Sequence, residues 1–218
     1  TYYQRFLQME EEFASFLRTE LNKKLPGDQA HAQMTDNIKL RQVQQANSTP
    51  RKAGVLILIY PHQQEFYIPF ILRPIYDGAH SGQIAFPGGR TEKEDLDIKH
   101  TALRETHEEI GVIVNRNAIV GTLSDLYIPP SNSLVTPTVA VISQKPDFIP
   151  DAREVDQVLE FPLYAFQNPY NQQAVQVELP NGLKLKTPGF LIENSIIWGA
   201  TAMMMNELLY IVKKFFTQ

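Results

Sequence analysis

The stretch GQIAFPGGRTEKEDLDIKHTALRETHEEIGV, residues 82–112, decides the fold of this chain. A strand-like run ends at residues 86–89 (FPGG), where proline and glycine permit a tight backbone turn. In the acidic helix that follows, Glu105, Glu108 and Glu109 stand three and four residues apart and therefore share one face. Like charges at this spacing repel, so either the face is solvated or a divalent cation binds there. Mg²⁺ and Mn²⁺ are hard ions that take carboxylate and carbonyl oxygens.

Together, the glycine turn and the acidic helix resemble the Nudix box. That pattern is Gly, a spacer, and then Arg-Glu-apolar-x-Glu-Glu-x-Gly-apolar on a loop–helix–loop. The matching positions are Gly89, Arg104, Glu105, Glu108, Glu109, Gly111 and Val112. Asp95 stands at the first acidic position, but the step to Arg104 is one residue longer than usual, and Thr106 replaces an apolar residue. The longer spacer and the run at residues 101–105 (TALRE) are similar to the Nudix branch that hydrolyses coenzyme A.

The segment upstream of the box resembles the signature of coenzyme A pyrophosphatases. The matching positions are Arg73, His80, Gly82, Gln83, Phe86, Pro87, Gly88 and Gly89. Ile71 stands where the signature has threonine, and Asp77-Gly78 stands where a Leu-Arg pair is often seen. The resemblance implies that Arg73, His80 and Gln83 contact the substrate. The alternative is structural: an arginine at a strand end and a histidine held within a loop.

The resemblance also implies roles for the acidic residues. Glu105, Glu108, Glu109 and the carbonyl of Gly88 would bind the metal. Arg104 would orient the carboxylates, and Glu105 and Glu108 would take part in catalysis. Nudix enzymes often use a further carboxylate from outside the box, either as a metal ligand or as a base. Glu154 is the candidate for that role and Glu160 the alternative.

Composition limits the classes of function. At 218 residues, with 43% hydrophobic and 20% charged residues, the chain is long enough for one globular domain with a sizeable core. Its formal net charge of −4 gives no general attraction to nucleic acid or anionic membranes. The absence of cysteine excludes disulfides and thiolate chemistry, and fits a cytoplasmic location. Neither a signal peptide nor a spanning segment is expected, since no apolar run approaches about 18 residues.

Residues 2–25 predict an amphipathic helix that ends at Pro26-Gly27. Its apolar stripe contains Phe6, Met9, Phe13, Phe16, Leu17 and Leu21. We expect this stripe to pack on the main domain, with a homodimer contact as the alternative. Residues 28–50 read as a long surface connection that could include a short helix between residues 30 and 40. His31 is expected on the surface.

The remainder alternates strand and turn patterns. Strands are predicted at residues 55–60, 66–72, 83–86, 112–120, 121–127, 134–143, 175–179, 183–186 and 189–198. The run at 155–163 follows an irregular polar stretch and is given no element. The acidic helix is expected at 96–110, with Leu96, Ala102, Leu103, Thr106 and Ile110 on its buried side. Arg104 can pair with Glu108 on its surface. A last apolar helix runs from 198 to 216, with its three consecutive methionines in the core.

These patterns, together with the resemblance, predict an α/β (α+β) Nudix fold in which a mixed β-sheet lies between helices. Residues 1–49 would form an added N-terminal helix and connecting loop, and residues 50–218 the Nudix domain. The implied reaction is Mg²⁺- or Mn²⁺-dependent hydrolysis of the pyrophosphate bond of coenzyme A or acyl-coenzyme A. The alternatives are a Nudix enzyme for ADP-ribose or another nucleoside diphosphate derivative, and a non-catalytic nucleotide-binding regulator. The expected partner is a small nucleotide rather than nucleic acid or a membrane.

Overall fold

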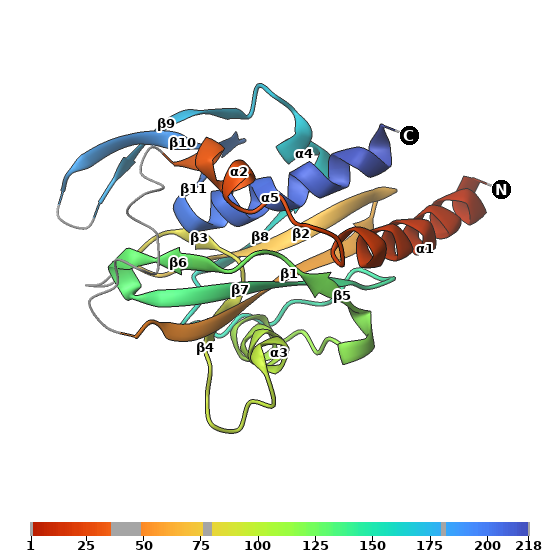
Figure 1. Cartoon of the computed structure of the whole chain (residues 1–218), viewed down its shortest axis with the longest axis horizontal. Helices are drawn as coiled ribbons and strands as arrows, with labels where there is room; N and C mark the ends of the chain where they lie inside the picture. Colours follow the sequence, from red (N-terminus) through yellow and green to blue (C-terminus); the bar gives the residue numbers. More distant parts are fainter. Residues whose placement is uncertain (1, 36–48, 76–79, 180–181, 218) are drawn as a thin grey trace.

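A computed structural model describes residues 2–35, 49–75, 80–179 and 182–217, with side chains from residue 8 onward (Figure 1). Within these ranges, eight strands form a mixed sheet and three form a separate antiparallel sheet. The mixed sheet comprises β1 (Arg51–His62), β2 (Glu65–Leu72), β3 (Ile84–Ala85), β4 (Gly88–Arg90), β5 (Ile119–Thr122), β6 (Leu126–Ile128), β7 (Ser133–Val141) and β8 (Gln157–Pro162). The smaller sheet comprises β9 (Gln172–Glu178), β10 (Lys184–Ile192) and β11 (Ser195–Trp198). The predicted fold class is confirmed.

The strand β1 organises the mixed sheet. It runs parallel to β7, with Arg51 opposite Ser133 and Ile59 opposite Val141, and antiparallel to β2 and β4. Its long apolar run is explained by burial on both faces, because helices cover each side of the sheet.

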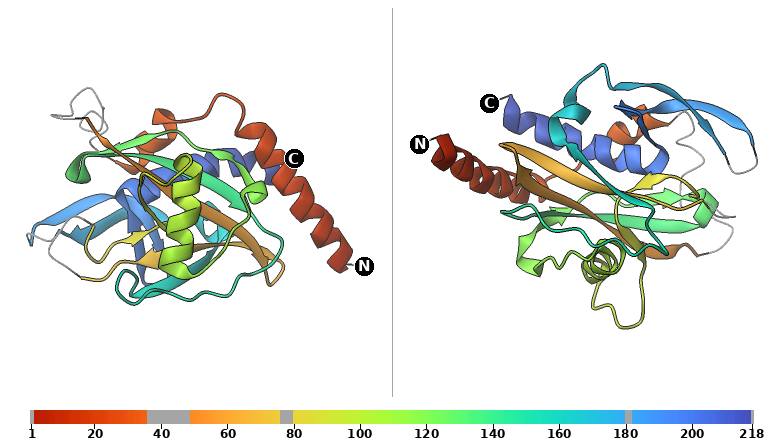
Figure 2. Two further views of the ribbon diagram at one scale, coloured as in Figure 1. Left: turned by 90° about the horizontal axis from the view of Figure 1, so that it is seen from below. Right: turned by 180° about the vertical axis from the view of Figure 1, so that it is seen from behind.

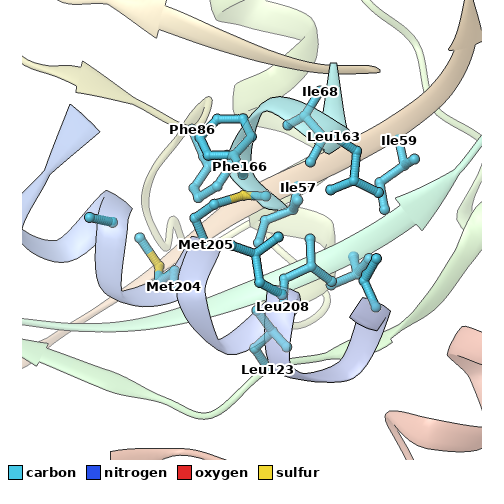
Figure 3. Close-up of a cluster of buried hydrophobic side chains, with 14 of the residues drawn as sticks. Ile57, Ile59, Ile68, Phe86, Leu123, Leu163, Phe166, Met204, Met205 and Leu208 are labelled. Atoms are coloured by element: carbon cyan, nitrogen blue, oxygen red, sulfur yellow. The ribbon is translucent and has the colours of Figure 1, made fainter. Parts of the chain in front are cut away.

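The two faces of β1 face different helices. Ile57 and Ile59 belong to the larger core, which includes residues of α5 (Gly199–Phe216). Leu56 and Leu58 belong to the smaller core with Ala102 of α3 (Ile98–Ile110). Figures 1 and 2 show α3 and α5 on opposite sides of the sheet, and Figure 3 shows Met204, Met205 and Leu208 of α5 among the larger core. The methionines are buried, as predicted.

The helix α3 has clear signals at both ends. The side chain of Asp97 caps its first turn by accepting a hydrogen bond from the backbone N–H of His100, and Gly111 ends it in the left-handed region at φ 73°. The predicted start at residue 96 is therefore two residues too early. Leu96, placed on the buried side by periodicity, precedes the cap and is 84% exposed.

The N-terminal segment packs on the rest of the chain. The helix α1 (Tyr2–Glu20) buries Phe13, Leu17 and its neighbour Leu21, and the Phe13 ring stacks on Phe66 of β2 at 4.4 Å between centroids. A single turn of helix, α2 (Asp28–His31), and a 3₁₀ turn, η1 (Ala32–Met34), follow. The rest of the predicted surface connection, residues 36–48, lies outside the described residues.

The prediction that His31 is a surface residue was wrong. His31 is 2% exposed, and its Nε2 lies 2.9 Å from a carboxylate oxygen of Glu207 in α5. The same carboxylate accepts hydrogen bonds from Ser124 Oγ at 2.6 Å and from the backbone N–H of Gly27 at 3.0 Å. Sequence reasoning considered only neighbours along the chain, whereas the partner lies 176 residues away.

Three other predictions needed correction. Residues 112–115 are irregular, a 3₁₀ turn η4 (Arg116–Ala118) follows, and β5 and β6 are shorter than the predicted strands. The run at 155–163 becomes β8 followed by the short helix α4 (Leu163–Gln167), which the sequence did not indicate. The predicted strand at 189–198 is the end of β10, a turn, and β11. The 3₁₀ turn η5 (Pro129–Ser131) links β6 to β7.

Candidate functional site

A cavity of about 710 Å³ opens at the glycine turn. Residues from both helix layers and both sheets line it. They are Ala53, Val55, Arg73, His80, Gln83, Ala85, Phe86, Gly88, Gly89, Arg90, Glu105, Glu109, Ile128, Pro130, Ser131, Ser133, Val135, Glu154, Leu179, Trp198, Gly199, Ala200, Thr201 and Met204. Its size is typical of a small-molecule site.

The two glycines of the turn let the strand β4 lie close to its neighbours. A Cβ on Gly88 would lie 2.4 Å from the carbonyl oxygen of Gly54 and 2.5 Å from Cα of Val55, and Gly88 has φ +156°. A Cβ on Gly89 would lie 2.4–2.6 Å from the carboxylate atoms of Glu105. The sequence signal Gly-Gly therefore has two separate physical causes: backbone packing at Gly88, and space for a carboxylate at Gly89.

The carboxylate of Glu109 is buried against this turn. The residue is 1% exposed, and its Oε2 accepts a hydrogen bond from the backbone N–H of Gly88 at 2.8 Å. Arg73 Nη2 lies 3.6 Å from the other oxygen. Burial raises the pKa of Glu109 to about 7, and the carboxylates of Glu105 and Glu154 add to the rise, while Arg73 and the Gly88 N–H oppose it.

Arg104 holds the outer carboxylates of α3. Its Nε and Nη2 each donate to one oxygen of Asp95 at 3.0 Å, and Nη1 lies 3.0 Å from both Glu105 and Glu108. Nη2 also donates to the carbonyl of Arg90. Hydrogen bonds from Arg104 hold the pKa of Asp95 well below its usual range, although burial opposes this. Asp95 thus holds Arg104, whose Nη1 contacts both Glu105 and Glu108.

Glu105 and Glu108 differ in their surroundings. The Glu105 side chain is 14% exposed and lines the cavity, and burial raises its pKa although Arg104 opposes the shift. The Glu108 side chain is 54% exposed, contacts Arg104 and is not among the cavity-lining residues. Glu105 and Glu109 therefore come together in the cavity, and Glu108 and Arg104 flank it.

Glu154 joins the cavity through a loop tied to the end of α3. The backbone N–H groups of Ile149 and Asp151 donate to the carbonyls of Ile110 and Glu109 at 2.9 and 3.0 Å. This arrangement places Glu154, 45 residues beyond Glu109 in the sequence, on the cavity wall. Glu160 does not line the cavity. It bonds to Lys145 and to the hydroxyl of Tyr60.

Arg73, His80 and Gln83 also line the cavity. Nη2 of Arg73 donates to the carbonyl of Gly88 at 3.3 Å, so this arginine supports the glycine turn. Nδ1 of His80 lies 3.1 Å from Oε1 of Gln83. Arg73 therefore makes a structural contact, and it also lines the cavity in which a substrate would bind. Asp77-Gly78, the departure from the signature, lies outside the described residues.

The donor set at the turn suits a hard divalent cation. Glu105, Glu109 and the Gly88 carbonyl offer only oxygen atoms, and the buried Glu109 carboxylate faces no full countercharge closer than the arginine at 3.6 Å. Across the described ranges, no three acidic or imidazole side chains are gathered as a preformed ligand set. A bound cation would complete its coordination from the carbonyl, water and substrate oxygens.

Sequence reasoning missed the part of the cavity that the C-terminal segment lines. Leu179, Trp198 and Met204 line it. Met204 was correctly predicted as a core residue, but nothing in the local sequence pattern indicates that it also lines the cavity. Trp198 stands before an apolar helix, which indicated a helix start and not a cavity.

Comparison with known families matches residues 50–176 to the NUDIX domain. A human protein named mitochondrial coenzyme A diphosphatase NUDT8 is 34% identical over 128 residues, covering 58% of this chain and 54% of that protein. The mouse protein of the same name is 31% identical over 143 residues, covering 65% of this chain and 68% of that protein. A Pectobacterium atrosepticum protein, named uncharacterized Nudix hydrolase NudL, is 31% identical over 166 residues, covering 72% and 81%. The chain thus spans about half the length of the human relative.

Solved structures agree on the fold. A MutT/nudix family protein from Enterococcus faecalis superposes with a TM-score of 0.52 at 14% identity, covering 77% of this chain and 64% of that one. The MutT protein from Methanosarcina mazei Go1 gives 0.51 at 14% identity, covering 78% and 99%. Identity this low supports the architecture alone.

Several sequence predictions stay predictions. They are the division at residue 49/50, the homodimer contact, the cytoplasmic location, the roles of the site residues and the choice of Mg²⁺ or Mn²⁺. In the part of the chain that the structure describes, no helix has the length and apolar character needed to cross a membrane.

Proposed function

Because the chain belongs to the NUDIX domain family, we propose that it hydrolyses the pyrophosphate bond of coenzyme A or an acyl-coenzyme A with Mg²⁺ or Mn²⁺. Water attacks one phosphorus and the bridging P–O bond breaks. The products are 3′,5′-ADP and 4′-phosphopantetheine or its acyl derivative. The observation that carries this proposal is that Glu105, Glu109, Glu154 and Gly88 all line one cavity.

Each of these polar residues has a proposed task. The cation would be held by Glu105, Glu109 and the Gly88 carbonyl. Glu108 would join them only after giving up its contact with Arg104. A divalent cation, when bound, supplies charge neutralisation for the diphosphate oxygens.

The remaining tasks concern orientation and proton transfer. Arg104 keeps the Glu105 carboxylate oriented, and Arg73 keeps the Gly88 carbonyl in place. Glu154, at the exposed side of the cavity, would accept the proton of the attacking water on its carboxylate.

The substrate is supported by two observations. The upstream signature at Arg73, His80 and Gln83 lies on the cavity wall, and two relatives are named coenzyme A diphosphatases. ADP-ribose or another nucleoside diphosphate derivative is the second candidate, because it would use the same carboxylates. A non-catalytic regulator would not need both Glu105 and Glu109 on a cavity wall beside a glycine turn.

A substrate panel tests the reaction. Coenzyme A, ADP-ribose and a dinucleotide polyphosphate are incubated with the protein and either Mg²⁺ or Mn²⁺, and the products are identified by mass. Preferential release of 3′,5′-ADP from coenzyme A is expected. Faster cleavage of ADP-ribose would replace the substrate, and no cleavage of any compound would overturn the enzymatic proposal.

Glu105→Gln tests the site within the same assay. The amide keeps the size of the side chain but removes the charge that would bind the cation, so we expect turnover to fall at least about 100-fold. Glu94→Gln, in the exposed loop before α3, is the matched control and should keep full turnover. Undiminished activity of Glu105→Gln, with the fold intact by circular dichroism, would refute the role of Glu105.

A further inference from the structure

An uncharged residue lies on the carboxylate face of α3 and has no task in the reaction as proposed. Thr101 stands four residues before Glu105, as Glu105 stands four before Glu109, so the three share one side of the helix. Thr101 is 0% exposed and does not line the cavity. A role in the reaction must therefore act through a neighbour of Thr101 and not through contact with the substrate.

The hydroxyl of Thr101 is bonded outside its own helix. Its Oγ1 lies 2.8 Å from Oδ2 of Asp95, but 3.5 Å from the carbonyl of Asp97, four residues back. Thr106 shows the ordinary case for a helix, because its hydroxyl lies 2.7 Å from the carbonyl of Ala102. A hydroxyl has one proton to donate, and the nearest acceptor for Thr101 is the carboxylate of Asp95.

Asp95 lies on a loop that offers it little support. The step from Asp95 to Arg104 is one residue longer than in the common pattern, and the neighbours of Asp95 on either side in the sequence are exposed. The Asp95 side chain is nevertheless 0% exposed. Besides Thr101, its Oδ2 accepts hydrogen bonds from the Glu92 N–H at 2.9 Å and from Arg104 Nη2 at 3.0 Å. The Glu92 donor belongs to the same loop and the arginine side chain is long. Of the three donors, the short side chain of Thr101 therefore ties the carboxylate most directly to the helix.

We infer that Thr101 is a positioning residue for the hydrolysis. It fixes the carboxylate of Asp95, which accepts hydrogen bonds from Nε and Nη2 of Arg104 at 3.0 Å. Nη1 of the same guanidinium lies 3.0 Å from Glu105 and from Glu108. Through these contacts Thr101 determines where the Glu105 carboxylate stands. The inference rests on the proposed function, which makes Glu105 a metal ligand.

Thr101→Val should displace the carboxylate of Asp95. Valine has nearly the shape of threonine, with a methyl group in place of the hydroxyl. A carbon atom approaches an oxygen to about 3.3–3.6 Å, so the Asp95 oxygen, which lies 2.8 Å from the hydroxyl, must move by about 0.5 Å or more. A displacement of about 1 Å at a reacting centre can cost about 100-fold in rate, so we expect half of it, passed on through Arg104, to lower kcat about tenfold. KM should stay unchanged, because neither Thr101 nor Asp95 lines the cavity.

Thr106→Val is the matched control for this variant. Thr106 belongs to the same helix, is also 0% exposed, and donates its hydroxyl proton within the helix. We expect Thr106→Val to keep the kcat of the unmodified chain, whereas a general effect of valine on the helix would lower kcat in both variants. Thr101→Ser keeps the hydroxyl that Asp95 needs and should restore most of kcat. Circular dichroism checks that each variant is folded.

Binding of Mn²⁺ gives a measurement that needs no substrate. Mn²⁺ alone is titrated into each variant, and the free ion is measured by electron paramagnetic resonance. Removing a group that supports a metal ligand typically costs about 10- to 100-fold in metal affinity, so we expect Thr101→Val to weaken Mn²⁺ binding at least about tenfold. Thr106→Val and Thr101→Ser should bind Mn²⁺ as the unmodified chain does.

The outcomes separate the two proposals. If Thr101→Val matches Thr106→Val in kcat and in Mn²⁺ binding, the positioning role is overturned and the hydrolase proposal stands. A higher KM with unchanged kcat would place Thr101 in substrate binding and overturn the inference as well. Weaker Mn²⁺ binding by Thr101→Val, in a chain that cleaves no compound of the substrate panel, would support the positioning role and overturn the proposed function. A chain that neither binds Mn²⁺ nor cleaves the panel would overturn both.

Discussion

At the residue scale, adjacent glycines in the turn have different constraints. Gly88 is limited by the backbone of β1, because a Cβ would overlap the Gly54 carbonyl and Val55. Gly89 is limited by a side chain, the carboxylate of Glu105. A carboxylate can move and a backbone in a sheet centre cannot, so the same substitution should have different consequences at the two positions.

Gly89→Ala is expected to damage activity more than stability. The added methyl would displace the Glu105 carboxylate, and a displacement of about 1 Å at a reacting centre can cost about 100-fold in rate. We expect a tenfold or greater loss of turnover, measured by 3′,5′-ADP release, with little change in the urea midpoint. Gly88→Ala is the contrasting variant and should lower the urea midpoint markedly.

A double variant checks the mechanism of that loss. In the Glu105→Ala background there is no carboxylate to displace, so adding Gly89→Ala should reduce the residual activity no further. Independent, multiplicative losses would show that Gly89 acts through something other than Glu105.

At the scale of elements, α3 is fixed at both ends. Its first turn is capped by Asp97, which also pairs with Arg116, and its last carbonyls accept hydrogen bonds from the loop that carries Glu154. Both Glu105 and Glu154 therefore depend on this one helix for their position.

The cap of α3 can be separated from its ion pair. Asp97→Ala removes the acceptor for the N–H of His100 and should lower the free energy of unfolding by about 1 kcal/mol. Asp97→Asn keeps that acceptor and loses only the exposed pair with Arg116, which contributes little. We expect urea unfolding to place Asp97→Asn close to the unmodified chain. Equal losses in both variants would assign the effect to the ion pair.

At the scale of the whole molecule, the two ends of the chain pack together. The helices α1 and α5 end near each other in Figure 2, and the ring centroids of Phe13 and Phe215 are 5.0 Å apart. Glu207 of α5 binds the segment after α1 through His31 and Gly27. The helix α5 also supplies Met204 to the cavity lining. The helix α5 therefore both anchors the N-terminal segment and helps to shape the cavity.

The Glu207 network should make stability depend on pH. Burial alone would raise the pKa of Glu207, but hydrogen bonds from His31, Ser124 and Gly27 outweigh it and lower the pKa below its ordinary value of 4.5. On acidification the unfolded chain takes up this proton first, so the stabilisation is present above about 4.5 and is lost as pH falls through the folded pKa.

Glu207→Gln isolates this contribution. The difference in unfolding free energy between the unmodified chain and the variant should be largest near neutral pH and shrink below about 4.5, as measured by urea unfolding across the acid range. A difference that is constant with pH would indicate that the carboxylate charge of Glu207 is irrelevant to stability.

The sequence by itself determined the family, the sheet between helices and the glycine turn. These features are local: the spacing of glutamates on α3, the adjacent glycines of the turn and the long apolar run of β1 are written within short segments. Of the predicted site residues, Arg73, His80, Gln83, Gly88, Glu105, Glu109 and Glu154 share the cavity.

Only the tertiary structure decided what faces these residues. The contact of His31 with Glu207, the separation of Glu108 from the cavity and the cavity lining at Leu179, Trp198 and Met204 all depend on contacts between distant segments. Periodicity along a chain reports which side of an element is buried, but not what that side meets. The positions of Glu105 and Glu109 on α3 were therefore predictable from local spacing, and the distant residues that line the same cavity were not.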